Sequence, residues 1–238
     1  MEIRRFFVSP DAIQGNDITI DGEEFRHAVK VLRHKVGYKI IVCDNSGKDY
    51  YATITEIGKD CLTARVDEIV ANDTATKRTI TLYQCISRGD RLDFSVQKAV
   101  ELGVRRIVPV VSEFSTEKDV NLDRLRRIVS EAAKQCGLAI LPEVSAPVGF
   151  DEAVAVAGDS AIVFYEHEKD NVVTAELVGE GDVSVFVGAE GGFSNREIEL
   201  ARANGAKTVS LGKRILRTET ATVAGLVIVA LFAGELGL

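Results

Sequence analysis

Hydrophobic and polar residues alternate along several short stretches of the first 70 positions, which is the pattern of half-buried β-strands. Between positions 61 and 70, for example, Leu62, Ala64 and Val66 alternate with polar neighbours. Turn-forming residues at 44–47 and 58–60 separate these stretches. The pattern predicts a mostly β-structured segment with strands near 18–20, 38–43, 50–57 and 61–70.

A helical period interrupts these strands at residues 23–33. The apolar positions of one face recur at i, i+4 and i+7, and they are Phe25, Val29 and Leu32. The positions one residue later carry positive charge, and they are Arg26, Lys30 and Arg33. Such a basic ridge is most often a solvated face. Together with Arg4 and Arg5, however, it is a candidate surface for an RNA backbone.

Beyond a polar linker at 71–77, strands alternate with amphipathic helices, and Asn121 is a predicted helix N-cap. The predicted strands lie at 79–86, 106–111, 139–144, 161–165, 183–187 and 208–211. The predicted helices lie at 90–103, 121–136 and 194–204, with a short one from 151 and a last one from about 218. Repeated strand–helix units imply a parallel sheet covered on both faces, so we expect an α/β protein with domains at 1–72 and 73–238.

The apolar strand 183–187 runs into a loop that contains Gly188, Gly191 and Gly192. Ser194 and Glu197 then have the spacing of a capping box, which predicts a helix start. Open α/β sheets place their ligands where such a strand ends. The loop matches neither the dinucleotide fingerprint nor the phosphate loop. Glu190 would repel a pyrophosphate, so a neutral or cationic ligand is favoured, and a glycine turn without any ligand is the alternative.

A second segment follows at Leu211-Gly-Lys-Arg-Ile-Leu-Arg-Thr-Glu-Thr-Ala221. One interpretation makes Thr218 the N-cap of the last helix and Glu219 an acid that its dipole favours. Arg217 does not fit that interpretation, because a cation at a helix N-terminus is unfavourable. Arg88 is another isolated cation at the end of a predicted strand.

Composition limits the possible functions. The 238 residues carry a net charge of −7, which argues against strong nonspecific binding to nucleic acid. The four cysteines lack the spacing of a zinc site, so no metal is expected. The longest apolar run, 223–233, is too short to span a bilayer, and no secretory signal is evident, so a cytoplasmic protein is expected.

The last helix is apolar almost all round, which predicts a homodimer; its apolar residues are Val223, Leu226, Val227, Val229, Ala230 and Phe232.

Gly188-Ala-Glu-Gly-Gly-Phe-Ser, together with the segment 211–221, resembles the bacterial ribosomal RNA small-subunit methyltransferase E family. These are SPOUT-class enzymes that use S-adenosylmethionine to methylate N3 of a uridine in 16S rRNA. The resemblance covers nearly the whole chain. It departs from the family pattern at Ala189, where the family usually has Pro, and at Leu138, where it usually has Arg. Further matching segments, in order, are Arg5-Phe-Phe, His27–Arg33, Ser87–Asp93, Gln97–Gly103 and Glu131–Gln135.

The resemblance implies a PUA-like RNA-binding β-barrel at 1–72 and a SPOUT domain with a trefoil knot at 73–238. It implies a role in rRNA processing, with 16S rRNA in the small ribosomal subunit as partner. The expected cofactor-binding residues are Tyr165, Val187, Gly188, Glu190, Gly191, Gly192, Leu211, Gly212, Ile215 and Leu216. The expected RNA-binding residues are Arg4, Arg5, Arg26, Lys30, Arg33 and Arg88.

The expected catalytic residues are Arg217, which would hold a uracil carbonyl oxygen, and Glu219; the N3 proton would pass either to water or to a carboxylate such as Glu219. Two other classes of function stay open at this point. One is an RNA-binding assembly factor, and the other is a protein that binds a nucleotide without methyl transfer.

Overall fold

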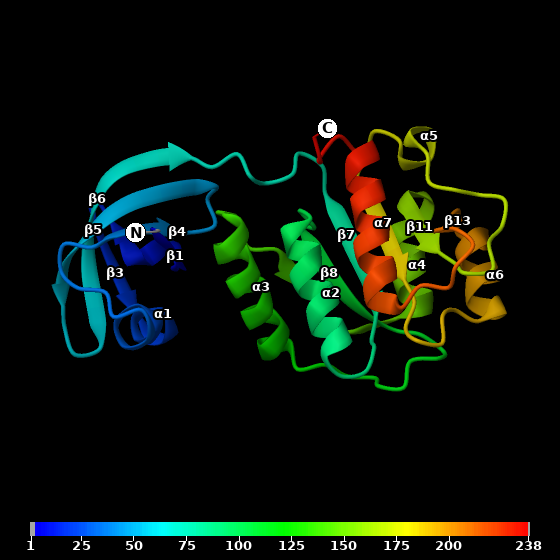
Figure 1. Ribbon diagram of the computed structural model, residues 1–238, viewed down its shortest axis with the longest axis horizontal. Coiled ribbons are helices and arrows are strands. Elements are labelled where there is room, and N and C mark those ends of the chain that lie inside the picture. Colours follow the sequence, from blue (N-terminus) through cyan, green and yellow to red (C-terminus); the bar gives the residue numbers. More distant parts are fainter. Residues whose placement is uncertain (1–2, 238) are drawn as a thin grey trace. The chain divides into compact units, whose positions relative to one another are not determined.

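The computed structural model describes residues 3–237, which form two compact units. The first unit contains the residues up to Ala75 together with 133–141, and the second contains Thr76–Ala132 and the residues from Pro142 onward. Each unit is built on its own sheet. Figure 1 follows the chain from the blue β-rich unit to the α/β unit that ends in red.

The first unit is a six-stranded sheet in the order β1-β4-β5-β6-β3-β2. Strand β1 pairs in parallel with β4, and the other neighbouring pairs are antiparallel. The predicted alternation is confirmed in β6, where Leu62 and Ala64 are buried beside more exposed neighbours. The strands are β1 (Arg4–Phe7), β2 (Ile13–Gln14), β3 (Asp17–Asp21), β4 (Lys39–Cys43), β5 (Lys48–Ile57) and β6 (Cys61–Ala71).

The helix expected at 23–33 is not a single α-helix. Helix α1 (Gly22–Arg26) passes into a π-helical turn at His27–Val31, whose backbone hydrogen bonds reach back five residues. Arg33 has a φ of 56°, in the left-handed region, and therefore lies outside the helix. The sequence pattern missed this break because it assumes a constant 3.6-residue period.

The second unit is a parallel sheet in the order β10-β8-β7-β12-β11-β13, with β9 beside β8. Every pairing in it is parallel, which confirms the expected α/β class. Strand β9 is shorter than the strand expected at 139–144, since residues 139–141 belong to the first unit, where the Leu141 N–H donates to Asn45 Oδ1 (2.9 Å). The strands are β7 (Ile80–Cys85), β8 (Arg106–Val111), β9 (Glu143–Val144), β10 (Val148–Gly149), β11 (Ala161–Phe164), β12 (Val183–Val187) and β13 (Lys207–Val209).

Helices cover both faces of this sheet. Helix α7 lies beside α2 in Figure 1 and also contacts β12, whereas α4 packs against α6. The predicted cap of α3 is confirmed, since the Arg124 N–H donates to Asn121 Oδ1 (2.9 Å). Within residues 3–237, no helix is long and apolar enough to cross a membrane. The helices are α2 (Asp90–Glu101), α3 (Leu122–Cys136), α4 (Phe150–Ala157), α5 (Ala175–Val178), α6 (Asn195–Ala203) and α7 (Thr218–Phe232).

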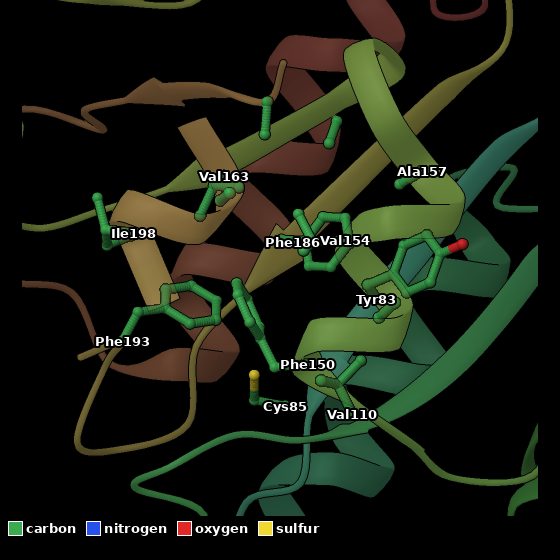
Figure 2. Close-up of a cluster of buried hydrophobic side chains, with 14 of the residues drawn as sticks. Tyr83, Cys85, Val110, Phe150, Val154, Ala157, Val163, Phe186, Phe193 and Ile198 are labelled. Atoms are coloured by element: carbon green, nitrogen blue, oxygen red, sulfur yellow. The ribbon is translucent and has the colours of Figure 1, made fainter. Parts of the chain in front are cut away.

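Aromatic residues fill the layer between the sheet and helices α4 and α6 (Figure 2). Tyr83 of β7 stacks on Phe186 of β12, with ring centroids 4.3 Å apart and planes 3° apart. Phe150, at the start of α4, meets Phe186 edge-on at 5.9 Å and Phe193 at 5.3 Å. Phe193 directly follows the glycine loop, so this core also holds the end of that loop.

The opposite face of the sheet contains a polar network between β7 and α7. Gln84 is fully buried, and its Nε2 donates to Thr218 Oγ1 (3.2 Å). Thr222 Oγ1 lies 2.6 Å from Gln84 Oε1. Thr218 Oγ1 in turn donates to the Gly188 carbonyl oxygen (2.6 Å). These hydrogen bonds fasten the first turn of α7 both to a central strand and to the glycine loop.

Gly225 lets α7 approach the sheet closely. A Cβ at this position would lie 2.2 Å from the ring of Phe164, the last residue of β11. Glycine costs a helix interior about 1 kcal/mol relative to alanine, so its presence here is explained by this close packing. The contact places Phe164 directly under α7.

Candidate functional site

A cavity of about 330 Å³ opens at the carboxyl ends of β11, β12 and β13, within the second unit. Parallel strands end at one edge of a sheet, so the loops that follow them converge there. Three segments form most of its wall, and a side chain of α2 and the start of α7 complete it. Its lining residues are Arg91, Phe164, Tyr165, Glu166, Val187, Gly188, Ala189, Glu190, Gly192, Leu211, Gly212, Arg214, Ile215, Leu216, Arg217, Thr218, Glu219 and Ala221.

The glycine loop forms a tight turn in which the Gly192 N–H donates to the Ala189 carbonyl oxygen (3.0 Å). Gly192 has a φ of 66°, and a Cβ there would lie 2.2 Å from the Glu166 carboxylate. A Cβ on Gly188 would lie 3.0 Å from Gly192 Cα. Only glycine satisfies both the conformation and the space at position 192.

The structure does not bring Gly191 to the cavity. A Cβ on Gly191 would meet Phe114 at 2.7 Å, so this residue faces the loop after β8. Gly191 thus differs from the other expected cofactor-binding residues, which do line the cavity. The turn between Ala189 and Gly192 carries Gly191 on its outer side, and the spacing of glycines in the sequence does not show which side each faces.

The predicted capping box is confirmed directly after this loop. The Glu197 N–H donates to Ser194 Oγ (3.2 Å), and Glu197 Oε2 accepts from the Ser194 N–H (2.9 Å). The second oxygen of Glu197 accepts from the Glu113 N–H (2.8 Å). Glu197 is fully buried, so one carboxylate fixes both the start of α6 and the loop after β8.

The interpretation that makes Thr218 the N-cap of the last helix is wrong. Arg217 occupies that position, with extended backbone, and Thr218 is the first helical residue. The Thr218 hydroxyl donates to the Gly188 carbonyl oxygen, as described above. Arg217 therefore stands at the cavity with an exposed side chain.

Three charged groups from different elements meet in the cavity. Arg91 Nη1 of α2 donates to Glu190 Oε1, and Arg91 Nε lies 4.0 Å from Glu219 Oε2. Burial tends to raise the pKa of Glu190, but hydrogen bonds from its own N–H, from Arg91 and from the Arg88 N–H outweigh it and lower that pKa. Among residues 3–237, the buried Glu219 Oε2 has no hydrogen-bond partner. Glu219 is also part of the cavity wall, beside the space that a ligand would occupy.

Sequence reasoning missed Arg91 as a site residue. It lies in the segment Ser87-Arg-Gly-Asp-Arg-Leu-Asp93, which we noted for its family resemblance, but no rule for strand ends points to the first turn of a helix. Phe164 and Arg214 were also missed as individual residues. Both adjoin expected residues, so the segments that form the cavity wall were predicted better than all of its members.

Of the expected RNA-binding residues, Arg5 has a different role. Its guanidinium donates to Asp49 (Nη2 to Oδ2, 2.8 Å) and to Cys43 Sγ (2.8 Å), and its side chain is only 9% exposed. An arginine committed to a buried carboxylate is not available to a phosphate. Arg26, Lys30 and Arg33 are exposed in the same unit.

Arg88 is the one expected RNA-binding residue that lies in the second unit. Its Nε donates to Thr116 Oγ1 (2.9 Å), and its N–H donates to Glu190 Oε1 (3.1 Å). Arg88 therefore stands beside the glycine loop, next to the cavity rather than in its wall.

Comparison with known proteins defines the class first. Residues 74–230 match the family model of the RNA methyltransferase domain, and residues 20–67 match that of the RNA methyltransferase PUA domain. The chain is thus an α/β protein of the RNA methyltransferase class with a PUA domain.

The particular family follows from individual relatives. The ribosomal RNA small subunit methyltransferase E of Aquifex aeolicus is 34% identical over 219 residues, which cover 89% of this chain and 93% of that protein. The protein of that name from Rickettsia conorii is 29% identical over 240 residues, covering 99% and 98%. The chain belongs to the ribosomal RNA small subunit methyltransferase E family.

Two solved structures are similar over almost the whole chain. The ribosomal RNA small subunit methyltransferase E from Neisseria gonorrhoeae, bound to S-adenosylmethionine, has a TM-score of 0.88 and 31% identity, covering 97% of this chain and 98% of that chain. A putative methyltransferase from Legionella pneumophila, also in complex with S-adenosylmethionine, has the same TM-score with 27% identity, covering 97% and 98%.

The loop after β11 carries Tyr165 and Glu166 into the cavity and is anchored by Glu168. Glu168 Oε2 accepts hydrogen bonds from the Thr208 hydroxyl (2.7 Å) and from Arg202 Nη2 (3.0 Å). The Thr208 hydrogen bond is the main cause that lowers the pKa of Glu168 to about 2, despite the opposing effect of burial.

The anchoring carboxylate gives a pH-dependent prediction. The folded-state pKa of Glu168 lies below the usual value of about 4.3, so its stabilising effect is complete above that value and is lost as pH falls toward 2. Glu168→Gln should lower the free energy of unfolding at pH 7 by about 1 kcal/mol. Urea denaturation from pH 7 down to pH 3 should show this difference shrink below about pH 4.5. The exposed Glu176→Gln is the control, and a pH-independent difference would contradict the anchoring role.

Proposed function

We propose that this protein uses S-adenosylmethionine to methylate N3 of a uridine in 16S rRNA within the small ribosomal subunit. The observation that carries this proposal is the cavity between the glycine loop and the segment 211–216, with Gly192 closed against Glu166. Family membership and the cofactor-bound relative from Neisseria gonorrhoeae support it. N3 as the target and 16S rRNA as the substrate rest on the resemblance of the motifs.

The cavity fits this cofactor in size and chemistry. A volume of about 330 Å³ lies within the range of small-molecule sites. Gly188, Gly192 and Gly212 offer backbone groups without side chains in the way. Ile215, which is 81% exposed, provides an apolar surface for a flat ring. S-adenosylmethionine, when bound, supplies the electrophilic methyl group.

The side chains at the start of α7 suit the remaining part of the reaction. As N3 forms its bond to the methyl carbon, the carbon–sulfur bond breaks and the N3 proton must leave. The carboxylate of Glu219, which lines the cavity, accepts that proton, and the charge of Arg91 helps to hold this carboxylate in place, since Arg91 Nε lies 4.0 Å from Glu219 Oε2. Arg217 holds a uracil carbonyl oxygen and stabilises the negative charge that develops on the ring.

The cofactor site is tested at Gly192. Gly192→Val should abolish binding of S-adenosylmethionine, because its side chain would displace Glu166 and force a left-handed φ on a branched residue. Isothermal titration measures the affinity, and circular dichroism reports the fold. Gly179→Val is a matched control, since Gly179 has a φ of 63° and no atom within 4 Å of its virtual Cβ. Normal binding by a folded Gly192→Val protein would place the cofactor elsewhere.

The role of Arg217 is tested by turnover. Arg217→Ala should lower kcat on the order of a hundredfold, as for loss of a charge-stabilising donor, with much less change in cofactor affinity. Arg217→Lys should recover only part of the lost kcat, because an ammonium does not reproduce the planar guanidinium. Lys213→Ala, in the same segment but not in the cavity wall, is the control. Loss of cofactor binding with normal turnover at saturation would make Arg217 a structural residue instead.

We also propose that the exposed charges of Arg26, Lys30 and Arg33 contact the RNA backbone. Reversing them to Glu should raise KM for the small subunit and flatten its salt dependence by about one unit for each lost phosphate contact. Lys39→Glu and Lys59→Glu, also exposed in the first unit, are the controls. An unchanged salt slope would mean that the three residues form only a solvated face.

A homodimer through α7 belongs to the same proposal, with each site completed by the partner chain. Val227 and Phe232 of α7 and Phe94 of the neighbouring α2 are each about two-fifths exposed, which leaves apolar surface beside the cavity-forming elements. Sedimentation showing an active monomer at micromolar concentration would contradict this. The proposal also includes the trefoil knot of SPOUT enzymes, which rests on the resemblance of the motifs. A ribosomal substrate implies action in the cytoplasm.

A further inference from the structure

Phe114 is a large apolar side chain in the loop after β8, and it is 46% exposed. Single exposed apolar residues are common and need no explanation by themselves. The hydrogen bonds that hold this loop and the residues beside it distinguish Phe114 from other exposed positions.

The loop is fixed on both sides of Phe114. The Ser112 N–H donates to Ser115 Oγ and the Ser115 N–H donates to the Ser112 carbonyl oxygen, both at 3.1 Å. Both serines are buried. Between them, the Glu113 N–H donates to the buried Glu197 of the capping box. The backbone of Phe114 is thus held before any partner arrives, which lowers the entropic cost of binding.

The Phe114 side chain lies against the bare outer side of the glycine turn. Its Cβ is 2.7 Å and its Cγ 3.3 Å from the position that a Cβ on Gly191 would take. The neighbours of Gly191 in that turn, Glu190 and Gly192, line the cavity. One turn therefore separates the cavity on its inner side from an exposed aromatic ring on its outer side.

Arg88 adds a cation to the same edge. Its guanidinium donates to Thr116, two residues after Phe114, and its backbone donates to Glu190. We name Phe114 and Arg88 together the outer platform. The loop also carries Glu113, Glu117, Lys118 and Asp119, so it has no excess of positive charge. A partner must be recognised here by stacking on the ring more than by attraction of phosphates.

We propose that the outer platform stacks an RNA base next to the target uridine, an inference that rests on the proposed function. N3 lies on the pairing edge of uracil, so the target nucleotide must leave its pair and its stack before it can react. The neighbouring base then loses a stacking partner. The ring of Phe114, on the outer side of the glycine turn, replaces that stacking partner. Arg88, on the same edge, contacts the RNA backbone.

The test compares three substitutions on small ribosomal subunits from cells that lack this gene. Phe114→Ala should raise KM for the subunits about tenfold. Phe114→Trp should keep KM near the wild-type value, because a larger aromatic ring stacks at least as well. Phe114→Leu should resemble Phe114→Ala, because it fills space without a π-face. The Kd of S-adenosylmethionine, measured by titration, should stay within about twofold of the wild-type value in all three variants, because Phe114 contacts the RNA and not the cofactor. The exposed Val156→Ala is the control.

Two results would overturn the platform. Wild-type KM in both Phe114→Ala and Phe114→Leu would show that no base stacks there. Weaker cofactor binding in Phe114→Ala that Phe114→Leu restores would show that Phe114 only packs on the glycine turn.

A second readout does not depend on methyl transfer. A photoreactive phenylalanine analogue at position 114 should crosslink to one RNA nucleotide in the small subunit, whereas the same analogue at Val156 should not. Absence of the crosslink would overturn the platform. Absence of methyl transfer by the wild-type protein, with the crosslink present, would overturn the proposed function alone.

Discussion

A buried polar contact between β7 and α7 is the constraint on which the site depends. Gln84 would be costly in an apolar layer if its amide were unpaired, but Cys85, Thr218 and Thr222 satisfy both its nitrogen and its oxygen. Because hydrogen bonds are directional, those from Gln84 to Thr218 and Thr222 fix the position of α7 along the sheet. Thr218 extends the same network to Gly188, so the start of α7 and the glycine loop are positioned by one set of hydrogen bonds.

The cavity wall owes its chemistry to this arrangement. Arg217 directly precedes the helix that the network holds, and Glu219 lies in its first turn, where Arg91 of α2 approaches it. The wall therefore carries arginine and glutamate side chains in similar number, and they come from four separate segments. Such a wall suits a ligand with both positive and negative groups better than a polyanion, in line with the acidic net charge of the chain.

Much of this architecture could be predicted from local patterns. The strand at 183–187, the capping box of Ser194 and the cap at Asn121 follow from residue type and spacing, and the structure confirms them. The π-helical turn at His27–Val31 could not be predicted, because it arises from a change of helical period. The commitment of Arg5 to Asp49 joins residues 44 positions apart, and the side of the turn that Gly191 faces depends on Phe114. Contacts of this kind depend on the tertiary fold.

The first unit is built from two separate segments of the chain, and this limits the order in which the chain can fold. Its sheet is made by residue 71, but Asn72 and Asn45 also form hydrogen bonds with Gly137 and Leu141, which come much later in the chain. Lys134 likewise pairs with Glu24 (2.7 Å). A nascent chain must therefore complete β7, α2, β8 and α3 before the first unit gains its last segment. The N-terminal unit begins folding first and finishes late, because its contacts with residues 133–141 close only after Thr76–Ala132 of the second unit has been synthesised.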